Sequence, residues 1–192
     1  MKSSKTMKYS HLTITNLPKS FDIANVVDYI QPISDFMRPE DILYDMYPAE
    51  SDGAGAEAAV LFKYDESSAG IYLVHTLYLQ TLSVYLSPWA SEADVLLYAA
   101  VVNAILAKHK RARLYDKYAP LKNLTDDDVH QMIKDRKAYL KRLLKTKDGF
   151  TMEGVNAGFT LKVSDLCPAI SPDMQVLELQ RQFVRMQWEI PE

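Results

Sequence analysis

The sequence predicts an α+β fold in which an antiparallel or mixed sheet is packed on one face by helices. Two observations lead to this fold class. Strand candidates cluster over residues 58–87 instead of alternating one by one with helices. A very apolar helix candidate follows at about 91–109. Only two of residues 93–107 are polar, which predicts a central helix that is fully buried in the core.

The N-terminal third predicts one strand and one helix. Residues 1–7 are polar and are expected to form a flexible tail. Polar and apolar residues then alternate over 11–17, which is typical of a half-buried strand, and Pro18 ends it. Apolar residues at helical spacing predict a helix that begins at Ser20 and ends before Pro32.

The next segment favours a loop followed by three strands. Residues 49–56 are rich in Gly, Ala, Ser and Asp and predict a loop. Residues 58–64, 71–76 and 77–87 are apolar or rich in Tyr, Val, Leu and Thr, which suit a pleated surface. The turn that should connect the last two of these strands, between residues 76 and 80, is not obvious in the sequence.

The second half predicts helices with recognisable starts. Ser91 and Asp94 have the spacing of a capping box, and Thr125 precedes an acidic first turn. Residues around Pro120 are interpreted as a linker. Residues 150–163 predict a hairpin, and Ser171-Pro172-Asp173 predicts a third helix start. Over 176–190 we favour a helix, with a strand as the alternative because large apolar residues also alternate there.

Length and composition indicate one intracellular domain. The chain has 192 residues, of which 48% are hydrophobic, and we expect a single α+β domain over 1–192. Its single cysteine allows no internal disulfide, which suits a reducing compartment and predicts a cytoplasmic protein. The apolar run 93–107 would span only about 22 Å as a helix, so no membrane association is expected.

Charge is distributed unevenly along the chain. Residues 108–147 contain 13 basic and five acidic side chains, a net charge of +8, although the whole chain carries −3. Residues 20–66 contain 11 acidic and only two basic side chains. This asymmetry is the strongest global signal in the sequence.

Catalytic and metal-binding motifs are not recognisable in the sequence. None of the four histidines lies at a metal-ligand spacing from another, and the acidic run 126–128 is explained by its helix start. We therefore assign no catalytic residue, metal or cofactor and favour a protein that is not an enzyme. The enzymatic alternative is a site assembled by the fold, with His11 or His75 beside a carboxylate.

The favoured function is a non-enzymatic protein-binding module, such as an adaptor, an inhibitor or an immunity-type protein. Its size, acidity and aromatic content suit a small bacterial partner-binding protein. The contact surface is expected in the acidic segment, where charge can steer a partner and aromatic side chains can anchor it. The residues are Asp41, Tyr44, Asp45, Tyr47, Glu50 and Asp52. The partner's identity stays open, and a homo-oligomer is possible.

The alternative partner is nucleic acid. Four lysines recur every three or four residues on one predicted helix face and could contact phosphates: Lys134, Lys137, Lys141 and Lys145. We favour a solvated helix face as the explanation of this stripe, with a protein contact, including pairing to the acidic segment 20–66, as a further alternative. A second basic cluster lies beside Tyr115 and Tyr118 and consists of Lys108, Lys110, Arg111 and Arg113.

Overall fold

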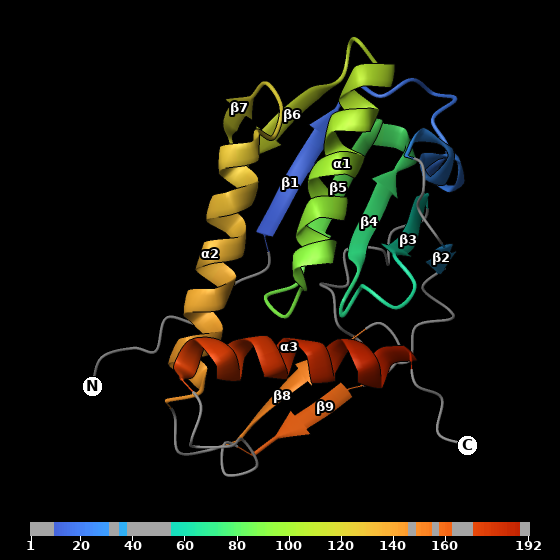
Figure 1. The fold of residues 1–192 in the computed structure, drawn as a ribbon. Coiled ribbons are helices and arrows are strands. Elements are labelled where there is room, and N and C mark those ends of the chain that lie inside the picture. Colours follow the sequence, from blue (N-terminus) through green and yellow to red (C-terminus); the bar gives the residue numbers. More distant parts are fainter. Residues whose placement is uncertain are drawn as a thin grey trace.

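The protein is built on an antiparallel sheet, as its computed structural model shows (Figure 1). The structure describes residues 10–30, 35–37, 55–145, 149–154, 158–162 and 171–188. The strand order is β2-β3-β4-β5-β1-β6-β7. The strands are β1 (Ser10–Thr15), β2 (Asp35–Met37), β3 (Ala56–Phe62), β4 (Ile71–Thr76), β5 (Thr81–Leu86), β6 (Arg113–Asp116) and β7 (Ala119–Leu121). Every neighbouring pair is antiparallel, so the α+β class is confirmed and the mixed-sheet alternative is not.

Alternation along the strands separates the two faces of the sheet. Leu12 of β1 and Val84 of β5 pair in register and lie on the face that packs against helices, in the largest buried cluster. Tyr72 and Val74 of β4 lie on the opposite face with Tyr85, in a second buried cluster. The sheet therefore buries side chains on both faces.

The central helix α1 (Glu92–Lys108) lies within one residue of its predicted position at each end, and it crosses the sheet over β4 and β5 (Figure 1). The capping box of Ser91 and Asp94 is present. The prediction of full burial is wrong, however. Leu96 is 50% exposed and Ala100 and Ala107 are exposed, because one side of α1 faces away from the sheet, η1 and α2 and is open to solvent.

Two predicted elements near the N-terminal half differ in type. The helix expected from Ser20 is a 3-10 helix, η1 (Ile23–Tyr29), and the Asp22 side chain caps it by accepting the Ala24 N–H at 2.8 Å. The strand expected over 77–87 begins only at Thr81. Residues 77–79 form a short 3-10 turn, η3 (Leu77–Leu79), between β4 and β5.

The segment interpreted as a linker around Pro120 is a hairpin. Strands β6 and β7 pair at the edge of the sheet, and Lys117 in their turn adopts φ 56°. The following helix α2 (Asp126–Leu143) has the predicted start, with a capping box formed by Thr125 and Asp128. A proline is compatible with β7 because the strand lies at the sheet edge.

The C-terminal elements are a hairpin and a helix, as predicted. Strands β8 (Phe150–Glu153) and β9 (Gly158–Leu161) pair with each other, and α3 (Pro172–Trp188) is a helix, so the strand alternative is wrong for its described residues. Figure 1 shows α3 crossing between this hairpin and the large sheet. A third buried cluster fills the space between the end of α2, the hairpin and α3.

Helices contact both faces of the sheet. Most helical contacts are made by η1, α1 and α2 on one face. Trp188 at the end of α3 instead stacks on Phe62 at 5.2 Å, in the cluster on the opposite face. Its indole N–H donates to the Ser67 carbonyl at 2.8 Å. The predicted one-sided arrangement therefore holds for η1, α1 and α2 but not for α3.

None of the described helices is both long and apolar enough to cross a bilayer.

Candidate functional site

An exposed apolar turn lies between β4 and β5. The side chains of Leu77, Tyr78 and Leu79 are 42%, 74% and 57% exposed. The backbone of this turn is fixed at both ends, since the Leu77 N–H donates to the Gly55 carbonyl at 2.9 Å and the Gln80 N–H donates to the Leu77 carbonyl at 3.2 Å. Three consecutive large apolar side chains held in solvent are typical of an interaction site.

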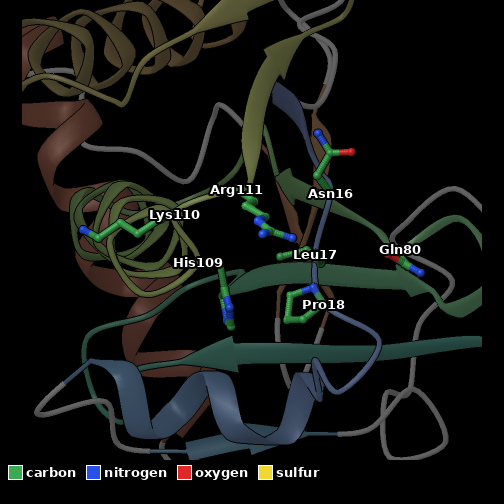
Figure 2. A pocket seen from close by; sticks show the side chains of 7 residues that line it. All are labelled: Asn16, Leu17, Pro18, Gln80, His109, Lys110 and Arg111. Atoms are coloured by element: carbon green, nitrogen blue, oxygen red, sulfur yellow. The ribbon is translucent and has the colours of Figure 1, made fainter.

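A groove of about 530 Å³ lies directly beside this turn (Figure 2). Three segments meet in it: the end of β1, the residue that ends η3, and the C-terminus of α1. The described residues that line it are Asn16, Leu17, Pro18, Gln80, His109, Lys110 and Arg111. Gln80 therefore belongs to both features, as it ends the apolar turn and lines the groove.

Two left-handed residues shape the backbone of the groove. Asn16 has φ 60° and Gln80 has φ 52°. The chain beside them is held by the Leu17 N–H, which donates to the Gln80 carbonyl at 3.2 Å. Asparagine tolerates this conformation, but it is uncommon for glutamine, and such residues cluster at binding and catalytic sites.

The C-terminus of α1 gives the groove its positive charge. His109 ends the helix, and Lys110 and Arg111 follow it with exposed side chains. Figure 2 shows the side chains of His109 and Arg111 beside Leu17 and Pro18, whereas Lys110 points away from them. The loop is held by Arg113, whose Nη1 donates to the Ala112 carbonyl at 3.0 Å. No acidic residue is found among the described lining residues.

A stack of aromatic rings joins the groove to the core. Phe21 lies edge-on to His75 at 4.8 Å and to His109 at 5.5 Å between ring centroids. His109 Nε2 also lies 3.4 Å from the Tyr29 hydroxyl, and Lys108 lies over the Tyr29 ring at 3.8 Å. This stack attaches η1 to the sheet and to the end of α1.

His75 is the least satisfied polar group in the described part of the chain. Its side chain is 2% exposed, and neither ring nitrogen has a hydrogen-bond partner among the described residues. The Glu57 carboxylate lies 3.7 Å from Nδ1. Burial lowers the pKa of His75 below 6.5, and Glu57 opposes this only in part. Burial and Lys108 likewise lower the pKa of His109.

We expect acidification to weaken the fold through these two histidines. Because their pKa values are lower in the folded state, their neutral forms stabilise the protein above about pH 6.5, and this contribution is lost as pH falls through and below that value. Urea unfolding at a series of pH values should show the loss. The His75→Leu variant should show a shallower pH dependence, and an unchanged slope would contradict the role of His75.

The acidic residues predicted as the contact surface lie outside the described residues. These are Asp41, Tyr44, Asp45, Tyr47, Glu50 and Asp52. Nothing in the structure tests that prediction.

The predicted lysine stripe on α2 is present but half of it is engaged. Lys137 pairs with Glu92 at 3.1 Å, and Lys141 pairs with Asp173. Lys134 and Lys145 are exposed. The stripe therefore faces the starts of α1 and α3 along part of its length, which leaves less of it for a nucleic acid.

The two histidines of the enzymatic alternative lie on opposite faces of the sheet. His75 is on the α1 face, whereas His11 stacks on Tyr85 at 4.4 Å on the other. His11 also lines a cavity of about 400 Å³ with Asp116, Asp128 and Asp135. Two of these carboxylates are engaged locally: Asp128 accepts from Thr125 and Asp135 accepts from Gln131.

Among the described residues, no three histidine, cysteine, aspartate or glutamate side chains are arranged so that they could hold a metal ion.

The turn and the groove were not recognised from the sequence. Residues 77–79 continue the β-forming composition of β4, so they were interpreted as strand. The sequence identifies Lys110 and Arg111 only as part of a basic segment, because their proximity to Asn16 and Gln80 depends on the fold. One sequence signal does mark the turn. Three large apolar residues precede Gln80 and do not alternate with polar ones, as they would in a half-buried strand.

Comparison with protein-family models, with curated proteins and with solved structures finds no match.

Proposed function

We propose that this protein is a non-enzymatic module that binds another protein through the apolar turn and the basic groove beside it. The observation that carries the proposal is the exposure of Leu77, Tyr78 and Leu79 on a turn whose backbone is fixed. A rigid apolar turn loses little conformational entropy on binding, so contact area at this point converts efficiently into affinity. The partner's contact surface would contain an apolar recess that accepts it.

Tyr78 is the expected centre of this contact. It is the most exposed of the three side chains, and tyrosine is enriched among residues that dominate binding energy. Replacing it should leave stability within about 0.5 kcal/mol, because an exposed side chain contributes little to the core. Binding and folding can therefore be separated at this position.

We expect Tyr78→Ser to weaken partner binding at least about tenfold. The measurement is affinity capture of the tagged full chain from nuclease-treated and untreated halves of a lysate of its native cells, followed by mass spectrometry. Tyr118→Ser is the matched control, since Tyr118 is 97% exposed in the β6–β7 turn and does not line the groove.

One protein retained by the native chain and by Tyr118→Ser, but lost by Tyr78→Ser, would support the proposal. Equal recovery by all three chains would place the contact elsewhere. A partner that disappears only after nuclease treatment, or no partner at all, would contradict a protein-binding function.

A further inference from the structure

We propose that the basic groove beside the turn binds a carboxylate-bearing peptide segment of the partner. This inference rests on the proposed function, because it names the chemistry that the partner places next to the apolar turn. The groove would hold acidic side chains, while Leu77, Tyr78 and Leu79 contact apolar ones. The residues that carry it are Arg111 and His109 with the carboxamides of Asn16 and Gln80, and Lys110 adds a positive charge beside them although its side chain points away in Figure 2.

The cations of the groove are free of ion pairs in the described part of the chain. Lys63, Lys137 and Lys141 each have a carboxylate within 4.0 Å. Lys110 and Arg111 have none among the described residues, and both are exposed. An unpaired guanidinium is well suited to a carboxylate, because its planar fork can donate two parallel hydrogen bonds.

The shape of the groove suits a side chain with both polar and apolar parts. Leu17, which is buried, and Pro18 supply its apolar lining, and Asn16 and Gln80 supply amide donors at its edge. Its volume of about 530 Å³ lies in the range of binding sites that hold a small ligand or a few side chains. Because the backbone at Asn16 and Gln80 is fixed by the Leu17–Gln80 hydrogen bond, the site is formed before binding.

Local charge favours a peptide over a nucleic acid. Asp22, which caps η1, and Asp28 within η1 are exposed, and η1 contacts His109 through Tyr29. The positive region is therefore short and bordered by carboxylates. A nucleic acid carries a phosphate at every residue and would extend into this border, whereas a peptide can alternate acidic and apolar side chains. Leu77 and Leu79 of the adjacent turn could contact the apolar side chains of such an alternating peptide.

The test is fluorescence anisotropy with the full-length protein and three labelled probes. The first is a short peptide that alternates glutamate with leucine. The second is the same peptide with glutamine for glutamate, and the third is an oligothymidylate of equal net charge. We expect the glutamate peptide to bind at least about tenfold more tightly than either other probe, a difference of about 1.4 kcal/mol.

A double variant tests whether the groove is responsible. Lys110→Gln with Arg111→Gln should abolish the preference for glutamate, and its midpoint of urea unfolding should stay unchanged because both side chains are exposed. The matched control is Lys134→Gln with Lys145→Gln, which removes the same charge from exposed positions on and just beyond α2, outside the groove. The control should keep the preference.

Each result decides one claim. Equal binding of the glutamate and glutamine peptides, or equal loss in both double variants, would overturn the inference. Tighter binding of the oligothymidylate would overturn it in favour of nucleic acid. If the peptides show no preference while Tyr78→Ser still loses its captured partner, the proposed function stands and only the groove's role fails. If the glutamate peptide is preferred but Tyr78→Ser keeps its captured partner, the groove is a carboxylate site and the turn is not the partner contact.

Discussion

Replacing Asp94 by alanine is expected to lower the free energy of unfolding by roughly 3–5 kcal/mol. The Asp94 side chain is fully buried at the start of α1. Its carboxylate accepts six hydrogen bonds from two chain segments. The donors are the N–H groups of Ser68, Ala69, Gly70 and Ser91 and the hydroxyls of Ser68 and Ser91, at 2.8–3.1 Å.

The size of this effect follows from the groups that Asp94 leaves behind. Alanine would strand buried N–H groups in the turn between β3 and β4, and each stranded donor costs about 1–3 kcal/mol. It would also detach α1 from that turn, because Ser68 and Gly70 lie more than 20 residues from Asp94 along the chain. Asp94 therefore acts as a helix cap and as a long-range connection at once.

Asp128→Ala is the matched control for this substitution. Asp128 occupies the same position in the capping box of α2, where it accepts from the Thr125 N–H at 2.8 Å and from the Thr125 hydroxyl at 2.6 Å. It is exposed, so only the cap is lost, at about 0.5–2 kcal/mol. Urea unfolding of both variants is the measurement. Equal losses would mean that the bonds to Ser68, Ala69 and Gly70 add nothing to the cap.

The comparison of these two capping boxes shows what the sequence could predict. Both helix starts follow from local spacing, and both are present. The second role of Asp94 could not be predicted, because it depends on where the β3–β4 turn lies after the sheet has formed. For the same reason the sequence identified Lys110 and Arg111 as basic but could not place them beside Gln80.

Errors in the predicted elements have physical causes of the same kind. The turn at Leu77 has strand composition, and a left-handed glutamine at residue 80 is not a usual turn signal. The β6–β7 hairpin was hidden by Pro120 and by charged residues, which an edge strand tolerates. Leu96 is exposed because one side of the apolar helix α1 is left uncovered by the sheet, η1 and α2, and composition alone does not reveal this.

Arg136 provides the second large effect, since its side chain is only 2% exposed and was not singled out in the sequence. It lies on α2 and reaches β1 and the residue that follows β5. Its guanidinium donates to the Ser87 carbonyl at 3.3 Å, to the Met132 carbonyl at 3.3 Å and to the Ser10 hydroxyl at 3.2 Å. No carboxylate lies within 4.0 Å of it among the described residues. Arg136 thus attaches α2 to the sheet without a close ion pair.

Burial makes the charge of Arg136 costly. It lowers the pKa of the guanidinium from its ordinary value in the unfolded chain to about 10, which corresponds to about 3 kcal/mol against the charged form. At neutral pH, below both values, the side chain is charged whether the protein is folded or unfolded, so this cost is fully present. It is relieved only as pH rises above about 10.

We expect the free energy of unfolding of Arg136→Met to lie within about 1 kcal/mol of that of the native protein. For Arg136→Ala we expect it to fall by about 2–4 kcal/mol. Methionine fills the space and removes the buried charge, which offsets the three lost hydrogen bonds. Alanine leaves a cavity as well. Urea unfolding separates the two outcomes, and Arg142→Met, at an exposed position on the same helix, should change stability by less than about 0.5 kcal/mol.

A loss with methionine as large as that with alanine would contradict this account of Arg136. It would mean that the three hydrogen bonds outweigh the cost of burying the charge, and that α2 is held to the sheet by polar contacts. The expected result assigns the attachment to packing, with the guanidinium acting mainly as a large side chain whose donors are satisfied. In that case α2 would keep its position in Arg136→Met, and it would still cover the part of the sheet around β1.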